Sequence, residues 1–340
     1  MVGGGSSAGA DGLAQAGGVG KPSGAQGGEA LGGERRLPTR IGGGEGVQKT
    51  LWRDAQAGFR EERDRRDSAR FHQRGVGGGD QVDADADGEV LLLEKDAGGN
   101  EVSQIYALES GRLTLLTDGK SRNQPNAWSK DGELIGFSST RRNGVDSDLY
   151  VMNPRDPASA RLVHESKGGG WAIIAFSPDK TFAYVADYNS VQDVDIYRLD
   201  LASGAMTPVG NPKAEIAFSG MEIAPDGTLW ATSDASSDFQ RLGRLDPASG
   251  KFTPVSKEQW DVDSFDVSDD GKTIVYEVNE AGSDRMRILD VASGKVTKVD
   301  VLPAGQIGGL EIAPWGEIGF SFSSAKSAAD VWSLDPATMQ

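Results

Sequence analysis

The chain contains no cysteine and only two histidines, His72 and His164, among its 340 residues. Without cysteine there is no disulfide, no thiolate nucleophile and no cysteine-ligated metal. The two histidines, in unrelated stretches of sequence, do not favour a zinc site. No apolar run approaches the roughly 20 residues that span a bilayer. The sequence therefore predicts no metal, no other cofactor and no membrane association.

A secretory signal is also missing from the start of the chain. The opening residues, MVGGGSSAGADGLAQAGGVGKPSGAQGG, contain no apolar core after a basic start. As written, the chain is expected in the cytoplasm, and the periplasm stays open if the true N-terminus has been lost. The absence of cysteine suits both compartments and does not choose between them.

Positive charge is scarce in most of the chain. The whole sequence has 35 Lys and Arg against 51 Asp and Glu, and residues 1–84 hold only 12 and 11 of these. Residues 85–340 are therefore left with 23 basic and 40 acidic side chains. Such a surface excludes a nucleic-acid backbone as partner and favours a neutral or basic peptide or protein.

What the sequence does contain is a repeat of about 45 residues. A turn-forming pair recurs at Asp87-Gly88, Asp131-Gly132, Asp179-Lys180, Asp226-Gly227, Asp270-Gly271 and Trp315-Gly316. About twenty residues after each turn comes a second landmark: YAL (106–108), YVM (150–152), YRL (197–199), GRL (243–245), RIL (287–289) and WSL (332–334). Two landmarks that share one period indicate a repeat architecture.

Each repeat consists of short strands and turns. SPDKTFAYVA and SDDGKTIVYEV place a polar turn before an aliphatic and aromatic run, and DPASGKFTPV adds a tight Ser-Gly turn. Four strands per unit predict an all-β propeller of about six blades, because a single blade cannot bury both faces of its sheet. The blades are expected at about 80–118, 124–165, 171–210, 218–256, 262–300 and 307–340.

The sixth unit is incomplete. After VWSLDPATMQ the sequence stops at a turn, where the other units continue into a fourth strand such as GKVTKV. Either an N-terminal segment supplies the missing strand, or the ring stays open.

Several quoted segments resemble a known family. WSKDG, FSPD and APDG, each followed by a strand, are similar to repeats of TolB-like propellers and of prolyl oligopeptidase-family serine peptidases. Residues 116–154 and 165–180 look like the propeller of bacterial dipeptidyl aminopeptidase or acylaminoacyl-peptidase members. The resemblance implies a substrate-gating propeller that lacks its α/β-hydrolase domain, is truncated and is inactive alone. The alternative is a free-standing TolB-like propeller that binds a protein or peptide on one face.

The sequence offers no catalytic residue. The only match to a nucleophile elbow, GSSAG around Ser7, lies in a Gly/Ser-rich stretch without the required strand and helix. A triad also needs a histidine as base. His164 is expected on the solvated surface of an outer strand, and His72 lies in the irregular first part of the chain.

Two acidic pairs and three arginines remain as candidate binding residues. Asp193/Asp195 and Asp261/Asp263 are able to bind a cation or an amine, although solvated loop tips are the simpler interpretation. The resemblance implies that loop residues such as Arg122, Arg141 and Arg142 contact substrate or a facing domain. A peptide or protein ligand on one face is therefore the expected partner.

Residues 83–94, DADADGEVLLLE, match the calcium-loop pattern from Asp83 to Glu94. The repeat favours another interpretation, because Asp87-Gly88 is the first of the six turns and EVLLLE takes the place of a strand. Residues 1–79, rich in Gly and Ala and without strand periodicity, are expected to be a disordered or out-of-frame leader before a propeller at 80–340.

Overall fold

The structure of the chain is a computed structural model, and it describes residues 82–84, 90–212 and 214–340. The chain divides into two compact units, Met1–Gly44 and Glu45–Gln340, and every described residue belongs to the second. The interpretation of residues 1–79 as a leader, together with Ser7 and His72, lies outside the described residues. No helix in the described part of the chain is long and apolar enough to cross a membrane.

The described residues form antiparallel sheets, five of four strands and one of three. The strands of the first three blades are β1 (Val82–Ala84), β2 (Val90–Lys95), β3 (Gln104–Glu109), β4 (Arg112–Leu115), β5 (Asn123–Trp128), β6 (Ile135–Ser139), β7 (Asp148–Asn153), β8 (Asp156–His164), β9 (Trp171–Phe176), β10 (Phe182–Ser190), β11 (Asp193–Asp200) and β12 (Met206–Pro208). Those of the last three are β13 (Phe218–Ile223), β14 (Leu229–Ser233), β15 (Arg241–Leu245), β16 (Phe252–Pro254), β17 (Val262–Val267), β18 (Thr273–Glu280), β19 (Ser283–Asp290), β20 (Val296–Lys298), β21 (Gln306–Ile312), β22 (Ile318–Ser324) and β23 (Ser327–Leu334). The predicted fold, an all-β propeller of six blades with the last one incomplete, is confirmed.

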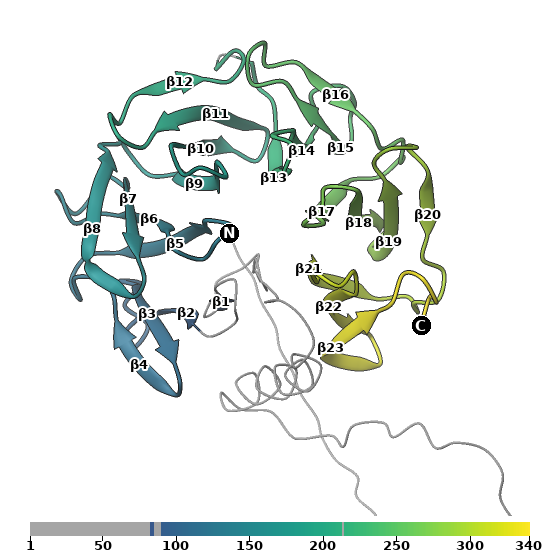
Figure 1. Cartoon of the computed structure of the whole chain (residues 1–340), viewed down its shortest axis with the longest axis horizontal. Helices are drawn as coiled ribbons and strands as arrows, with labels where there is room; N and C mark the ends of the chain where they lie inside the picture. Colours follow the sequence, from purple (N-terminus) through teal and green to yellow (C-terminus); the bar gives the residue numbers. More distant parts are fainter. Residues whose placement is uncertain (1–81, 85–89, 213) are drawn as a thin grey trace, which may run out of the picture. The chain divides into compact units, whose positions relative to one another are not determined.

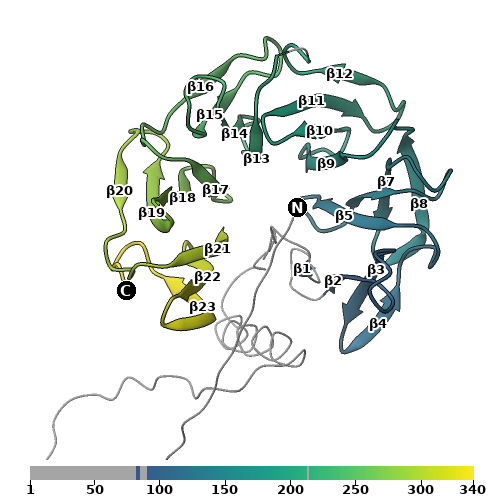
Figure 2. The ribbon, with the colours of Figure 1, turned by 180° about the vertical axis from the view of Figure 1, so that it is seen from behind.

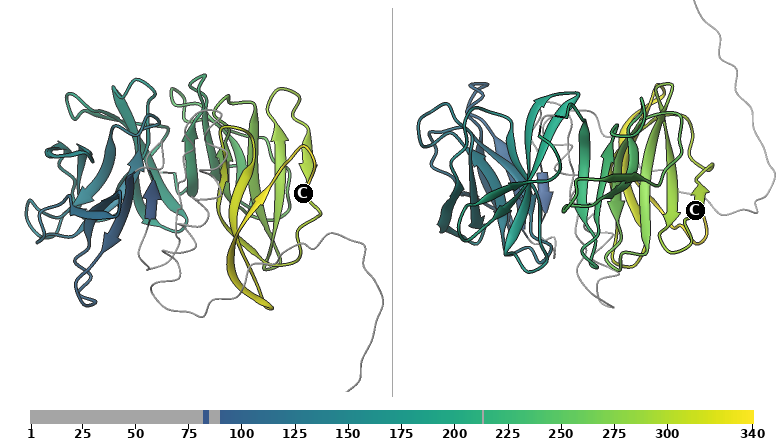
Figure 3. Two further views of the ribbon diagram at one scale, coloured as in Figure 1. Left: turned by 60° about the horizontal axis from the view of Figure 1, so that its bottom comes forward. Right: turned by 90° about the horizontal axis from the view of Figure 1, so that it is seen from above.

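The six sheets follow one another around a common centre (Figure 1). Within a blade the strands pair in sequence order, so that the first strand lies nearest the centre and the fourth lies outermost. The view from behind shows the same order (Figure 2), and the side views show hairpin turns and loops at both ends of the strands (Figure 3).

The repeated turns explain why the chain folds back at a fixed interval. Gly132, Gly227 and Gly271 adopt φ of +71°, +83° and +69°, a left-handed conformation that glycine reaches without steric cost. Strand β2 covers Val90–Lys95, so the VLLLE part of the predicted strand EVLLLE is confirmed. Asp85, Asp87 and Gly88 themselves lie outside the described residues.

Apolar side chains are buried mainly between neighbouring blades. Five clusters each combine residues of two consecutive blades, and each is anchored by large buried side chains: Phe137 for blades 1 and 2, Leu149 for blades 2 and 3, Tyr184 for blades 3 and 4, Trp230 for blades 4 and 5, and Phe320 for blades 5 and 6. Among the described residues no such cluster joins blade 6 to blade 1. Each blade is thus stabilised by its neighbours, as the repeat predicted.

Side chains of the inner strands also tie one blade to the next. Glu222 of β13 accepts a hydrogen bond from the backbone N–H of Val267 (3.1 Å), and Asp266 of β17 accepts one from Ile312 (2.6 Å). Burial and the nearby Glu222 carboxylate raise the pKa of Asp266 well above its ordinary value. Equivalent positions in successive blades therefore satisfy backbone donors across the interface.

Two glycines in equivalent turns allow the packing of neighbouring blades to be tested. Gly250 and Gly294 both have left-handed φ, +69° and +68°, but a Cβ on Gly250 would lie 2.1 Å from the Gly210 Cα, whereas one on Gly294 meets nothing within 4 Å. We expect Gly294→Ala to lower the free energy of unfolding by about 1–2 kcal/mol through backbone strain alone. Gly250→Ala should cost clearly more, as measured by urea unfolding. Equal losses of unfolding free energy in the two variants would contradict the close approach of Gly250 to Gly210.

Candidate binding face

The order of strands in each blade sorts the connections onto two faces. In a four-stranded meander the turns between strands 1 and 2 and between strands 3 and 4 lie at one end of the strands. The connections between strands 2 and 3, and those that lead to the next blade, lie at the other end. We call these the turn face and the loop face (Figure 3).

Aspartates of the turn face are engaged by the turns themselves. Asp179 accepts hydrogen bonds from the Ser177 hydroxyl (2.7 Å) and the Thr181 backbone (3.1 Å), and the Ser268–Asp270–Lys272 turn repeats this arrangement. Such bonds to the charged form lower the pKa of Asp179, and those from Lys272 and Ser268 lower the pKa of Asp270 to about 2. These aspartates therefore serve local turn structure.

Three carboxylates on the loop face of blade 5 are in a different environment. Glu277 of β18 accepts a hydrogen bond from the Ser264 hydroxyl of β17 (2.9 Å). Asp284, at the start of β19, accepts one from the Ile307 backbone of blade 6 (2.7 Å). Glu277 and Asp284 are 6% exposed, and the Glu277 Oε2 and Asp284 Oδ1 have no hydrogen-bond partner among the described residues. Asp263 completes this group, which we call the blade-5 carboxylates.

The blade-5 carboxylates retain protons at unusually high pH. Burial raises the pKa of Glu277 to about 8, and the charges of Asp284 and Asp263 act in the same direction against the Ser264 hydrogen bond. Burial also raises the pKa of Asp284 and of Asp263. A positive group near them would offset the free-energy cost of burying charged carboxylates and would reduce the repulsion between them. Among the described residues no group of three acidic or histidine side chains is arranged to hold a metal ion.

A second acidic group lies on the loop face of blade 3. Asp187 and Asp195 are opposite each other on β10 and β11, and the Asn189 amide donates to Asp195 (3.2 Å). Burial raises the pKa of Asp187, and the charges of Asp195 and Asp193 raise it further. The predicted pair Asp193/Asp195 thus extends to a third carboxylate.

Exposed apolar side chains accompany these acidic groups. Val145 and Val191 lie in the loops that join strands 2 and 3 of blades 2 and 3, and Tyr188 lies near the end of β10; their exposed fractions are 73%, 76% and 52%. Trp260, in the connection to blade 5, is 43% exposed and lies beside Phe239, with ring centroids 6.4 Å apart. The loop face therefore combines carboxyl groups of raised pKa with exposed apolar side chains.

Two of the three predicted arginines are engaged inside blade 2. Arg142 binds both carboxylate oxygens of the fully buried Asp148 (2.7 and 2.9 Å) and the Ser166 carbonyl (3.0 Å). The guanidinium of Arg141 lies 4.4 Å from the centre of the Tyr150 ring. Their observed contacts order the loop, whereas Arg122 is exposed in the connection before β5.

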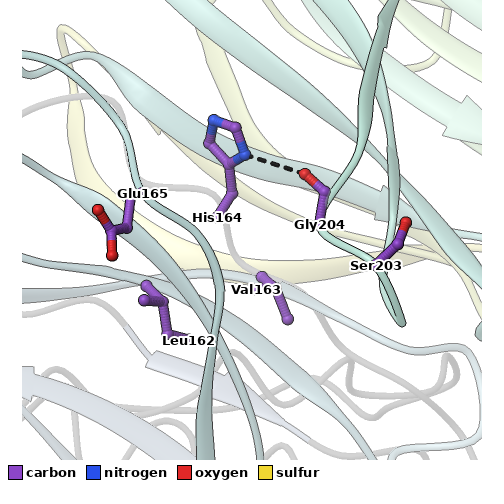
Figure 4. Close-up of a pocket in the computed structure, with 6 residues that line it drawn as sticks. All are labelled: Leu162, Val163, His164, Glu165, Ser203 and Gly204. Atoms are coloured by element: carbon purple, nitrogen blue, oxygen red, sulfur yellow. Dashed lines mark hydrogen bonds between the residues drawn. The ribbon is translucent and has the colours of Figure 1, made fainter.

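His164 lies on the outer strand β8, as predicted, but its ring is not fully solvated. Its Nδ1 lies 3.1 Å from the Gly204 carbonyl of blade 3, and its ring packs near Trp171 at 6.1 Å. Figure 4 shows the ring in a shallow depression with Leu162, Val163, Glu165, Ser203 and Gly204. The histidine joins two blades, and among the described residues its ring nitrogen contacts a backbone carbonyl rather than a serine hydroxyl.

Sequence reasoning missed Glu277 and Asp284. Glu277 interrupts the apolar run TIVYEV, where a charged residue in a buried strand signals a special environment. Asp284 carried no such signal, because it follows a tight hairpin among other polar residues. Of the predicted pair Asp261/Asp263, Asp263 belongs to the blade-5 carboxylates and Asp261 lies two residues before it.

Comparison with known sequences gives a limited match, and no family model matches the chain. Dipeptidyl-peptidase 5 of Porphyromonas gingivalis is 29% identical over 159 residues, which cover 42% of this chain and 22% of that protein. The match therefore involves only a minor part of the longer peptidase.

Solved structures show the same fold. A prolyl endopeptidase superposes with a TM-score of 0.62 at 13% identity, over 76% of this chain and 40% of its own, and a puromycin hydrolase with 0.59 at 17%, over 80% and 44%. A putative TolB from Agrobacterium tumefaciens gives 0.52 at 20%, over 71% of this chain and 91% of its own. The predicted resemblance to prolyl oligopeptidase-family and TolB propellers is confirmed at the level of fold. The chain spans less than half the length of the two peptide- or drug-hydrolysing proteins.

The pKa of Glu277 predicts an unusual pH dependence. Because the folded protein binds this proton up to about pH 8 and the unfolded chain only to about 4.5, the proton's stabilising contribution is lost as pH rises between these values. Glu277→Gln should match the parent near pH 4.5 and be more stable by up to about 4 kcal/mol at pH 8.5. The exposed Glu109→Gln is the control in thermal melts across this range. Parallel pH profiles for parent and Glu277→Gln would refute the assignment.

Proposed function

We propose that this chain is the substrate-gating propeller of a prolyl oligopeptidase-family peptidase and that it receives peptide segments on its loop face. The observation that carries the proposal is the contrast between the two faces. Aspartates of the turn face are held in the ionised form by local hydrogen bonds, whereas the loop face presents carboxylates with raised pKa and unused hydrogen-bonding capacity beside exposed Tyr188, Val191 and Trp260.

The ligand that suits this face is a peptide with a basic group and apolar neighbours. A peptide amine or a lysine or arginine side chain would lower the cost of holding Asp187 and Asp195 close together. Apolar residues of the peptide would contact Trp260 and Tyr188. The excess of acidic residues over residues 85–340 would attract such a peptide from a distance.

Peptide-bond hydrolysis is assigned to groups outside the described residues. His164 is the histidine of the described part, and its Nδ1 contacts a backbone carbonyl rather than an acidic residue. A serine protease triad requires a histidine that is held by a carboxylate and faces a serine. The proposal therefore gives the propeller a role in admitting and orienting the peptide.

The second candidate is a free-standing TolB-like propeller that binds a folded protein. It is favoured by one observation: the match to the putative TolB covers 91% of that chain, against 40–44% for the two hydrolases. The two candidates differ in ligand. A gating propeller binds short peptides, whereas a TolB-like module needs the surface of a folded partner.

Peptide binding can be assigned to a face with two matched tryptophans. Trp260 on the loop face and Trp315 on the turn face are 43% and 44% exposed. Titration calorimetry with a Lys-containing apolar hexapeptide should show binding that Trp260→Ala weakens about fivefold or more, the loss of roughly 1 kcal/mol of contact. Trp315→Ala should bind as the parent does. A stronger effect of Trp315→Ala, or tighter binding of the same hexapeptide with Glu in place of Lys, would overturn the proposal.

Catalytic activity is tested separately. The purified chain should remain unlabelled by a fluorophosphonate probe, which reacts with serines activated by a neighbouring base. A prolyl oligopeptidase-type enzyme serves as positive control in the same reaction. Labelling of this chain would show that it contains an activated serine and would contradict the assignment of hydrolysis to other groups.

A further inference from the structure

Blade 2 uses two carboxylates to hold the segment that leads into blade 3. Asp148 accepts a hydrogen bond from the Ser166 N–H (2.9 Å), and Asp146 accepts one from the Gly168 N–H (2.7 Å). Arg142 donates to both carboxylates, with N–O distances of 2.7, 2.9 and 3.1 Å. Because a guanidinium stays charged throughout the physiological pH range, this contact has a permanent counter-charge.

Blade 5 holds the segment that leads into blade 6 in a similar way, through Asp284. The Asp284 N–H donates to the Gly305 carbonyl (2.8 Å), and the Asp284 Oδ2 accepts from the Ile307 N–H (2.7 Å). Between these two residues, Gln306 donates its side-chain amide to the Gly282 carbonyl (3.0 Å). Residues 282–284 therefore fix the start of β21 at the loop-face end of blade 5.

Strand pairing places Glu277 beside Asp284. In the pairing of β18 with β19, Glu277 is opposite Met286 and Asn279 is opposite Asp284. Because residues two apart in a strand share a face, Glu277 and Asp284 lie on the same face as diagonal neighbours, within reach of a long side chain. This face packs against blade 6, since Met286 belongs to the same buried cluster as Ile307.

Each of the two carboxyl groups has one engaged oxygen and one that lacks a partner. Glu277 Oε1 accepts from the Ser264 hydroxyl, and Asp284 Oδ2 accepts from blade 6. The remaining oxygens, Glu277 Oε2 and Asp284 Oδ1, are buried and have no hydrogen-bond partner among the described residues. One proton between these two oxygens would satisfy both, because a carboxylic acid donates a hydrogen bond and a carboxylate accepts one.

The other charged groups of blade 5 do not replace this proton. The exposed Asp263 of β17 adds a further negative charge beside Glu277. Arg285 and Arg287 of β19 lie on the opposite face of the sheet, where they pair with Glu280 at 3.8 and 2.6 Å. Lys298 of β20 is opposite Arg287 and shares that face.

The charged groups of blade 6 lie away from the pair. In β21, which packs against β18 and β19, Glu311 lies farther along the strand toward the turn face. Asp300 is exposed in the connection before β21, and Lys326 is exposed in the hairpin between β22 and β23. The charged residues that act on Glu277 are therefore acidic, Asp284 and Asp263.

We propose that Glu277 and Asp284 share one proton, and that this proton controls the contact between blades 5 and 6 at the loop face. While the proton is bound, the pair carries one negative charge and Asp284 holds the Ile307 N–H. Its loss leaves two carboxylates on one buried face, and their repulsion moves Asp284 away from Ile307. The pKa of Glu277, raised to about 8 by burial, places this release near pH 8. The contact of blade 2 with Ser166 stays closed, because Arg142 keeps its charge.

Hydrogen exchange of the full chain tests the release. Protection factors, which correct for the effect of pH on intrinsic exchange, are measured by mass spectrometry for the segments that contain Ile307 and Ser166. Between about pH 6.5 and about pH 9 the Ile307 segment should lose about tenfold in protection, because the protonated fraction falls about tenfold per pH unit above the pKa. The Ser166 segment is the internal control and should keep its protection. Constant protection at Ile307, or an equal loss at Ser166, would overturn the proposal.

Two substitutions that each remove one charge separate the shared proton from a general loss of stability. Glu277→Gln places an amide N–H where the shared proton lies, and Asp284→Asn keeps an oxygen for the Ile307 N–H. Each variant should keep the Ile307 segment protected over the whole pH range. The exposed Glu109→Gln should behave as the parent does. If the loss of protection persists with the parent's pH profile in either charge-removing variant, the proposal is wrong.

Ser264 gives the test a direction as well as a loss. Its hydroxyl donates to Glu277 (2.9 Å) and thereby lowers the pKa that burial raises. Ser264→Ala should therefore move the midpoint of the Ile307 protection profile to higher pH by about half a unit or more. A Glu277 that served only for packing would show no such shift. An unchanged midpoint, or a shift to lower pH, would contradict a proton held by this pair.

Discussion

The structure depends on the burial of apolar side chains between adjacent blades. A four-stranded sheet has two faces, and a blade of about 40 residues has no helix or second sheet of its own to cover either. Residues such as Phe137, Tyr184 and Trp230 therefore lie between two blades, and each of the five clusters draws on both neighbours. Because each interface is shared, a blade cannot be removed from the series without exposing the apolar faces of its two neighbours.

The same interfaces explain the acidic residues with raised pKa. Asp284 and Asp266 accept hydrogen bonds from backbone N–H groups of the following blade. In these positions their carboxyl groups are buried, which disfavours the charged form. A buried carboxylate is tolerated when it is hydrogen-bonded or retains its proton, and Glu277 and Asp266 have pKa values raised in that direction. Protonation thus allows the interface between blades 5 and 6 to contain several acidic groups without full mutual repulsion.

The sequence was sufficient to predict the fold because the repeat is explicit. The turn pairs near Asp131-Gly132 and Asp226-Gly227 and the landmarks at YVM and GRL locate strands independently of any tertiary contact. The site was harder to predict. Asp193 and Asp263 were recognised as candidate acidic residues, but their relevant partners, Asp187 and Asp284, become neighbours only through strand pairing or sheet geometry. His164 was placed on the correct strand, yet its contact with Gly204 depends on the next blade, forty residues along the chain.

The turn face and the loop face differ because the backbone is constrained differently at the two ends of the strands. Turns between strands 1 and 2 and between strands 3 and 4 are tight, and most of those described use an aspartate such as Asp179 or Asp290 to accept local donors. Those side chains have little freedom to recognise a ligand. Loops between strands 2 and 3 differ in length, from the tight hairpin at Ala281-Gly282 to the long segment between Ser139 and Asp148. Only this face can therefore vary from blade to blade while the repeat and its interfaces stay constant.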